Sequence, residues 1–340
     1  MFNNSKKIIF TILTAVFVFF SFGLVAHAQS LIPQIPDDTQ FFVRPENPRP
    51  NELVGISIEN YAKDLDVLDI TWSLNGVVQQ KGVGLKTFQF TTKGLGSVSI
   101  VKISASDFSK EITIRPVGLG LFWQTNNYTP PFYKGKSLYT YQSRAQVVAI
   151  PSFVTSSGTT LDPKTLIYKW STNGSVLGKD SGYGKNVLST GGWVLAKPVT
   201  ISVTATSADG NFKAENSISL GGSVPQVLVY ENHPLYGVLY NTAIPSAFTL
   251  NSKEISFFVA PYFFNTNKRD NSLLAYKWKM NGRSIPNQTN PYSLVLRTPD
   301  GQGETSVGLS IQKTDDTLQY GEFSTKIYFN ADSADSTQKI

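Results

Sequence analysis

The sequence contains one short pattern, Trp-x-x-Asn-Gly, three times at nearly even spacing. The copies read "ITWSLNG", "YKWSTNG" and "YKWKMNG", and their tryptophans are Trp72, Trp170 and Trp278. The tryptophans lie 98 and 108 residues apart, which is about the length of one β-sandwich domain. Self-similarity at this period predicts three domains of one kind in the 340-residue chain.

Each tryptophan lies in a segment where apolar and polar residues alternate. In the first copy Ile70, Trp72 and Leu74 alternate with Thr71 and Ser73. A period of two with one apolar face predicts a half-buried strand, here with the indole as a structural core residue. The Asn-Gly pair after each strand supplies the two positive-φ residues of a tight hairpin turn. These turn residues are Asn75, Gly76, Asn173, Gly174, Asn281 and Gly282.

Further alternating segments surround each tryptophan in the same order. One precedes it and three follow it, and the last two of these are separated by a turn signal such as "ADG". In the first copy the alternation changes phase between Ile100 and Val101, which predicts a β-bulge there. Every copy therefore predicts a set of short strands joined by tight turns, so the fold class is all-β.

This pattern resembles the immunoglobulin-like β-sandwich, in which a core tryptophan lies on a central strand. The Trp-x-x-Asn-Gly step is also similar to bacterial extracellular immunoglobulin-like and PKD-like domains. The Gly-Asp-Gly common in PKD domains and the cysteine pair of antibody domains are both missing. The resemblance implies three tandem immunoglobulin-like β-sandwich domains in an extracellular protein.

The N-terminus has the pattern of a signal peptide. Lys6 and Lys7 precede an apolar run, and Ala26 and Ala28 then have the spacing of a signal-peptidase site. We expect cleavage after Ala28, which places the mature chain outside the cytoplasm, secreted or at the cell surface. An uncleaved membrane anchor is the alternative, because the apolar run is near spanning length. The chain has no cysteine, which excludes a disulfide framework and thiol catalysis.

These observations predict a division of the chain into six parts. The expected parts are a signal peptide at 1–28, a Pro-rich lead-in at 29–50, immunoglobulin-like domains at 51–115, 116–223 and 224–330, and a polar tail at 331–340.

Two similar aromatic segments, at 118–138 and 221–244, join the predicted domains. The stretch "YTPPFYKGK" in the first also resembles a segment between immunoglobulin-like domains of uncharacterised exported bacterial proteins, which implies export and modularity but no chemistry. The aromatic residues either pack neighbouring domains together or form an exposed patch that stacks on sugars or anchors a protein. The candidate patch consists of Trp123, Tyr128, Phe132, Tyr133, Tyr230 and Tyr236.

Residues that could carry catalysis are sparse. His233 is the one histidine outside the signal segment, and the sequence has no Gly-x-Ser-x-Gly nucleophile motif. One histidine without cysteine also argues against zinc. The carboxylates in "KDLDVLD" (63–69) and at 315–316 could serve a glycosidase or calcium, but they lack a recognised loop. We expect no catalytic residue, cofactor or metal, and leave calcium at 64–69 open.

Charge narrows the class of partner. The formal net charge is +6, or about +4 once Lys6 and Lys7 are removed with the signal. The basic residues form no run, which argues against nucleic acid. Our first hypothesis is a non-enzymatic structural or adhesive module array, with a surface protein or cell-envelope glycan as partner. The second is a carbohydrate- or wall-binding protein that uses the joint aromatics, and the third is an extracellular hydrolase. Membrane contact would occur only through an uncleaved signal.

Overall fold

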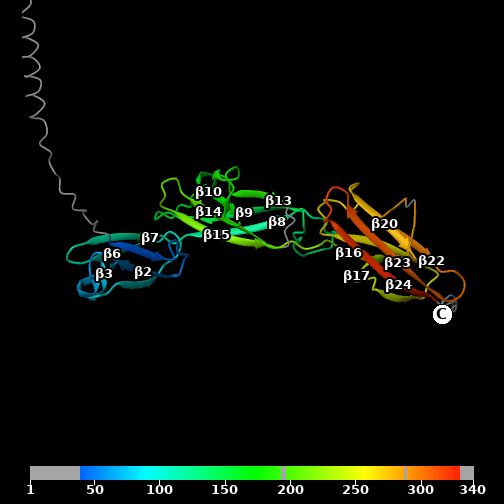
Figure 1. Cartoon of the computed structure of the whole chain (residues 1–340), viewed down its shortest axis with the longest axis horizontal. Coiled ribbons are helices and arrows are strands. Elements are labelled where there is room, and N and C mark those ends of the chain that lie inside the picture. The colour runs from blue at the N-terminus through cyan, green and yellow to red at the C-terminus, as the bar shows by residue number, and fades with distance from the viewer. Residues whose placement is uncertain (1–38, 193–196, 287–288, 330–340) are drawn as a thin grey trace, which may run out of the picture.

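Three β-sandwich domains lie end to end in the computed structural model, which describes residues 39–192, 197–286 and 289–329 (Figure 1). All three are immunoglobulin-like in topology, so the predicted all-β fold class is confirmed. The predicted signal peptide at 1–28 and tail at 331–340 lie outside the described residues and stay predictions. No helix in the described ranges has the length and apolarity needed to cross a bilayer.

The first domain packs a three-stranded sheet, in the order β1-β2-β5, on a four-stranded sheet, in the order β4-β3-β6-β7. A short 3-10 turn, Leu65–Val67, leads into β3. Neighbouring strands in both sheets are antiparallel. The strands are β1 (Gln40–Arg44), β2 (Leu53–Glu59), β3 (Asp69–Leu74), β4 (Val77–Val83), β5 (Thr87–Thr91), β6 (Ser99–Ser104) and β7 (Ser109–Ile114).

The second domain repeats this plan. One sheet has the order β13-β9-β8, and the other has the order β11-β10-β14-β15 with β12 also paired to β10. A 3-10 turn, Pro163–Thr165, again leads into the tryptophan strand, β10. The strands are β8 (Gly118–Thr125), β9 (Arg144–Ser152), β10 (Ile167–Thr172), β11 (Ser175–Val176), β12 (Gly182–Tyr183), β13 (Val187–Gly191), β14 (Val199–Thr206) and β15 (Lys213–Leu220).

The third domain adds two elements to the plan. Strand β17 forms an extra hairpin on β16, and the short β18 crosses to the other sheet, where it pairs parallel to β24. The sheets have the orders β17-β16-β19-β22 and β18-β24-β23-β20-β21. The strands are β16 (Gln226–His233), β17 (Gly237–Ala243), β18 (Ala247–Leu250), β19 (Glu254–Tyr262), β20 (Leu274–Met280), β21 (Arg283–Ser284), β22 (Ser293–Arg297), β23 (Gly303–Lys313) and β24 (Tyr320–Phe329).

Each domain has its own core around its tryptophan. Trp72, Trp170 and Trp278 are all buried, with at most 2% of the residue exposed. Each indole Nε1 donates a hydrogen bond to a backbone carbonyl just before the next strand of the opposite sheet. The acceptors are the carbonyls of Leu85, Lys185 and Pro291, at 2.8, 2.7 and 2.8 Å. The bond satisfies the one polar atom of the indole inside an apolar core.

The asparagine of each Asn-Gly turn has a second role besides the turn. All three asparagines have positive φ, between 47° and 51°, followed by a positive-φ glycine, as a type I′ turn requires. Each side-chain Oδ1 also accepts a 2.9 Å hydrogen bond from the backbone N–H of Ile100, Thr200 or Ser306. We call this contact the asparagine clamp, and it ties the hairpin of the tryptophan strand to the strand beside it.

Two expectations from the sequence are corrected by the strand register. The predicted bulge between Ile100 and Val101 is wrong, because β6 pairs with β7 without a register shift and Ile100 simply points outward, 42% exposed. The register shift lies between Trp72 and Ser73, where β3 pairs with β4. The predicted lead-in at 29–50 is also too long, since residues 40–44 form β1 and pair with β2 of the first domain.

Candidate functional site

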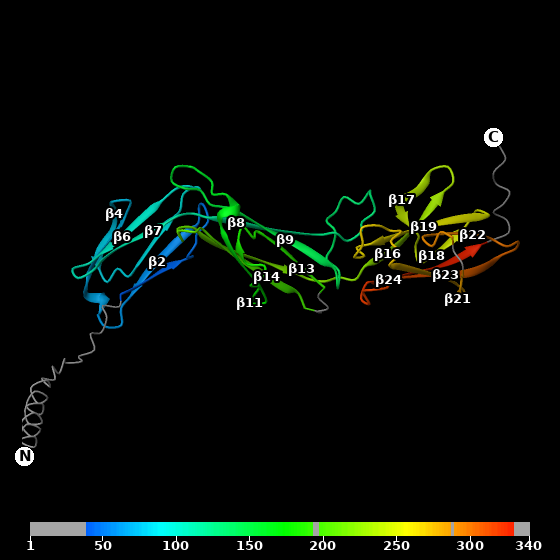
Figure 2. The same ribbon diagram turned by 90° about the horizontal axis from the view of Figure 1, so that it is seen from above.

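The predicted aromatic patch gathers at the joint between the second and third domains. Phe132 and Tyr133 belong to the loop between β8 and β9, and this loop reaches the third domain (Figure 2). They pack on buried side chains of β16, of the end of β19 and of Phe263 just after it. We call this group the aromatic joint cluster: Phe132, Tyr133, Tyr230, Ala260, Tyr262 and Phe263. The joint therefore contains residues from both predicted aromatic segments.

Ring geometry in the aromatic joint cluster is mostly edge-to-face. The Tyr133 ring centroid lies 5.8 Å from that of Tyr262 and 5.5 Å from that of Phe263, with T-shaped geometry. Phe132 lies 6.2 Å from Tyr230, also T-shaped. The hydroxyls of Tyr230 and Tyr262 share a buried 3.0 Å hydrogen bond. Burial raises the pKa of Tyr262, and its bond with Tyr230 acts in the same direction. These side chains therefore hold two domains together.

Hydrogen bonds, two of them buried, form the other half of the joint. Thr140 and Gln319 are fully buried, and Gln319 Nε2 donates to Thr140 Oγ1 at 3.0 Å. Thr140 Oγ1 in turn donates to the Phe263 carbonyl at 2.8 Å. Gln319 Oε1 accepts from the Asn265 backbone N–H at 2.8 Å, and Gln142 Oε1 accepts from the Leu318 N–H at 2.6 Å. We call these the polar joint network.

Tyr128 adds a short backbone pairing between the domains. Its N–H donates to the Phe264 carbonyl at 2.8 Å, and its carbonyl accepts from the Phe263 N–H at 2.7 Å. Burial also raises the pKa of the Tyr128 hydroxyl. Tyr128 is therefore a joint residue through both its backbone and its half-buried ring.

Two of the predicted patch residues lie apart from this joint. Trp123 on β8 packs partly against the core of the second domain, with Lys136 Nζ 3.4 Å from its ring centroid. Burial lowers the pKa of Lys136. Tyr236, at the tip of the β16–β17 hairpin, is 77% exposed and stacks on His233 at 4.8 Å. The structure thus does not bring the six predicted residues together on one surface.

The carboxylates from the sequence search have structural contacts of their own. Asp64 caps the 3-10 turn by accepting from the Asp66 N–H at 2.9 Å, and Asp66 pairs with Lys86 at 2.9 Å. Asp315 and Asp316 both pair with the buried Lys313, which holds the pKa of Asp315 below its usual value. In the part of the chain that the structure describes, no three His, Asp or Glu residues form a group that could hold a metal ion.

His233, the remaining candidate for catalysis, has a local role. Its Nδ1 accepts from the backbone N–H of Leu235 at 3.2 Å and more weakly from that of Tyr236 at 3.4 Å. These bonds shape the tip of the hairpin. His233 therefore stabilises the turn by accepting backbone hydrogen bonds, as an Asp or Asn side chain does in an Asx turn.

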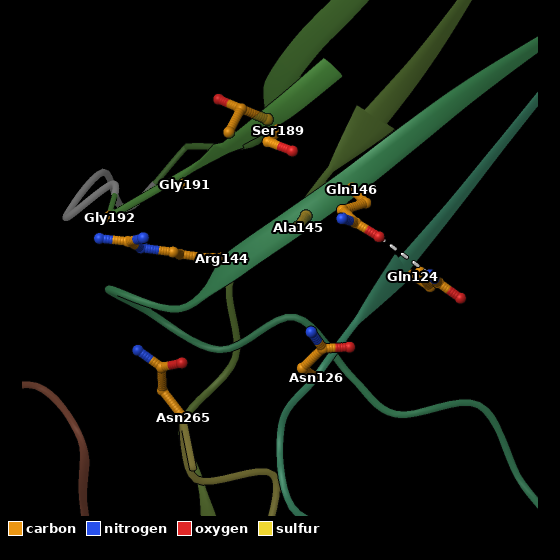
Figure 3. Close-up of a pocket in the computed structure, with 10 residues that line it drawn as sticks. Gln124, Asn126, Arg144, Ala145, Gln146, Ser189, Gly191, Gly192 and Asn265 are labelled. Atoms are coloured by element: carbon orange, nitrogen blue, oxygen red, sulfur yellow. Dashed lines mark hydrogen bonds between the residues drawn. The ribbon is translucent and has the colours of Figure 1, made fainter. Parts of the chain in front are cut away.

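A polar cleft of about 650 Å³ lies beside the joint, and sequence reasoning missed it (Figure 3). Gln124 on β8 and Gln146 on β9 form its floor, with a 3.1 Å hydrogen bond between their amides. Arg144 lies at the start of β9, and Asn265 reaches it from the third domain. We call it the amide cleft. Its side chains carry no local motif, because they come from separate strands and from two domains.

Comparisons with known proteins are limited to structural similarity. No protein family matches the chain, and no curated protein matches it. Among solved structures, the three N-terminal domains of the Highly Immunogenic Outer Capsid protein (Hoc) of bacteriophage RB49 are 13% identical, over 86% of this chain and 97% of that one, with a TM-score of 0.26.

Two further solved structures are similar at the same low level. The Clostridium thermocellum CbhA fibronectin(III)-like modules are 12% identical over 62% of this chain and 97% of that one, with a TM-score of 0.21. Sidekick-1 immunoglobulin domains 1–4 are 11% identical over 86% of this chain and 74% of that one, with a TM-score of 0.19. These similarities concern the fold class alone.

Proposed function

We propose that the chain is a non-enzymatic exported or cell-surface protein whose three immunoglobulin-like modules form a structural or adhesive array. The polar joint network carries this proposal. Thr140 and Gln319 lie 179 residues apart in the sequence and meet in a fully buried hydrogen bond between two modules. Such a bond favours one spacing and angle of the modules, because a tilt that breaks it without admitting water leaves a buried polar group without a partner. Fixed geometry suits a spacer or a presenting arm.

The sequence supports export independently of the fold. The apolar run before Ala28 has the flanks of a cleaved signal, and a chain without cysteine has no thiols to protect outside the cell. An exported array of sandwiches without disulfides must be stabilised by its cores, and each module contains a buried tryptophan with a satisfied indole.

Cell fractionation with N-terminal sequencing tests the proposal directly. The expected result is a chain in the extracytoplasmic fraction whose first residue is Gln29. A chain that keeps Met1 and stays in the cytoplasm would contradict it. A variant with Ala28 changed to Asp should block cleavage at that site and leave the folded modules unaffected, which separates processing from folding.

Glycan binding through the joint aromatics has less support than the array. Phe132, Tyr133 and Tyr230 pack on one another and on neighbouring rings of the third domain, so their faces are largely occupied. A polysaccharide pull-down with the mature chain compares the two functions. If binding occurs and is lost on changing Tyr236, the exposed member of the group, to Ala, the aromatic interpretation gains support.

A further inference from the structure

We infer that the amide cleft binds a saccharide that carries a carboxylate. In this assignment Arg144 pairs with the carboxylate, and the amides of Gln124, Gln146 and Asn126 bind ring hydroxyls. The inference goes beyond the proposed structural role, because it gives the array a ligand and a position for it. Three observations support the inference: the chemistry of the residues that line the cleft, a glycine that shapes its wall, and the position of the cleft between two domains.

The lining is amide-rich and open. Its volume, about 650 Å³, is in the range of small-molecule sites, which also favour domain boundaries. Gln124, Gln146 and Asn126 are exposed side chains that line it (Figure 3). Each amide offers both a donor and an acceptor, as each sugar hydroxyl does. The described residues that line it include no large apolar side chain of the kind that anchors a peptide.

Arg144 contributes a charge that the fold does not use. Within residues 39–192, 197–286 and 289–329, no carboxylate forms an ion pair with it. The residue at the same register position of the third domain is Glu254, which pairs with Arg297 at 2.7 Å. A guanidinium presents donors alone, in a fork that matches a carboxylate.

Gly191 shapes the wall of the cleft. It lies opposite Arg144 in the register of β13 and β9. A Cβ on Gly191 would lie 2.3 Å from the Ser143 carbonyl oxygen and 2.6 Å from Arg144 Cα, so no other residue allows this approach. The matching positions are Thr91 in the first domain and Arg297 in the third. The glycine is specific to the second domain.

The amide pair is also confined to the second domain. The positions that match Gln146 are Gly55 in the first domain and Ser256 in the third, as the pairing with the neighbouring strand shows. Neither can supply the amide that Gln124 contacts. The cleft therefore does not follow from the immunoglobulin-like plan itself, which all three domains share.

Asn265 brings the third domain into the site. Its Nδ2 donates to Asp316 Oδ2 at 3.3 Å and weakly to the Gln142 carbonyl at 3.4 Å. Its backbone N–H is fixed by Gln319. A ligand that contacts Arg144 and Asn265 together therefore meets two domains already held in place, which lowers the entropic cost of binding.

Titration calorimetry with the mature chain, residues 29–340, tests the assignment. The probes are a short oligogalacturonate and the same oligomer with its carboxylates reduced to alcohols. We expect the acidic oligomer to bind more tightly. Arg144→Gln should weaken it by about tenfold or more, the scale of a charge-assisted hydrogen bond, and change binding of the reduced oligomer little. Replacing both Gln124 and Gln146 by Ala should weaken both probes.

Arg283→Gln is the matched control, because Arg283 on β21 is also exposed and its removal lowers the net charge equally. Equal loss in both arginine variants would assign the binding to general charge and overturn the inference. So would equal affinity for the two probes, no binding of either, or binding of an acidic peptide in preference to both. Arg144 is exposed, and an unchanged circular dichroism melting curve verifies that its variant folds. The binding result does not depend on whether the chain is exported, so the two proposals are tested separately.

Discussion

The joint between the first and second domains has a short connection and few polar contacts, whereas the joint between the second and third is a larger buried interface. At the first, three residues, 115–117, connect β7 to β8. The Val117 N–H donates to the Pro48 carbonyl at 2.9 Å, and Lys213 pairs with Glu46 at 3.1 Å with both side chains largely exposed. An exposed pair of this kind contributes little to the free energy of unfolding.

The second joint differs from the first because of an inserted loop, and not because its domains have a different fold. The loop of residues 126–143 supplies Phe132, Tyr133, Thr140 and Gln142, and the first domain has a much shorter connection between β1 and β2. Domains with the same fold are therefore joined by few contacts at the first joint and by a buried interface at the second. What decides the difference is a single loop that crosses to the next module.

Removing one ring of the aromatic joint cluster should have the largest effect. Phe132→Ala takes away contacts with Tyr230, Tyr240 and Tyr262, and we expect it to lower the free energy of unfolding by about 3 kcal/mol. Small-angle scattering should then show a broader range of angles between the second and third domains. Phe122→Ala is the control, because Phe122 is 61% exposed on β8. Equal destabilisation by both changes would contradict a joint-specific role.

Breaking the polar joint network should have the next effect. Gln319→Ala removes one of the hydrogen bonds to Thr140 and leaves the Asn265 N–H without its acceptor, and we expect a loss of about 2 kcal/mol. Hydrogen exchange at the Asn265 amide should accelerate, whereas exchange in the core of the first domain should not change. Gln226→Ala at the exposed start of β16 is the control, and unaltered exchange at Asn265 in the Gln319 variant would argue against the network.

Acid should weaken the third domain next to the second joint. Lys313 holds the pKa of Asp315 below the ordinary 3.8. A depressed folded-state pKa gives stability that is present above the unfolded value and is lost as pH falls through the folded value. The thermal midpoint of the wild type should therefore fall more between pH 6 and pH 3 than that of Asp315→Asn. Parallel curves for the two proteins would show that the pair contributes nothing.

The smallest effect is expected at the first joint. Glu46→Gln removes the exposed pair with Lys213, and the thermal midpoint should change by the equivalent of about 0.5 kcal/mol or less. Added salt should reduce the difference between the midpoints of the wild type and the variant, because it screens an exposed ion pair. A shift comparable to that of Phe132→Ala would mean that the two joints are equally tight, and the contrast between them would be lost.

The sequence predicts the modules well and the joints poorly. Alternation around Trp72 and the Asn75-Gly76 pair depend on local geometry, so strand and turn can both be inferred from a few residues. The second role of Asn75, as an acceptor for the Ile100 N–H, depends on a strand 25 residues away, and no local pattern indicates it. What does point to it is that asparagine, and not another turn residue, recurs in all three copies.

The candidate site was the hardest part to predict. Phe132 and Tyr133 stand out as aromatic residues, but their partners follow about a hundred residues later and on another domain. The amide cleft combines Gln124, Arg144 and Asn265, which lie in unremarkable sequence. Only the pairing of β8 with β9 and the closed joint bring them together. The β18 strand, parallel to β24, is a second arrangement that alternation alone does not predict.

The asparagine clamp has a consequence for the order in which the chain can fold. Each clamp joins residues 25 to 27 positions apart within one module, so it can close once that short stretch has reached the compartment where the chain folds. The same hydrogen bond recurs in all three modules, so a clamp by itself does not distinguish one module from the next. If the chain arrives from its N-terminus, each module can complete its own clamp before the next tryptophan strand follows. Such an order would favour pairing within a module over exchange of strands between neighbours.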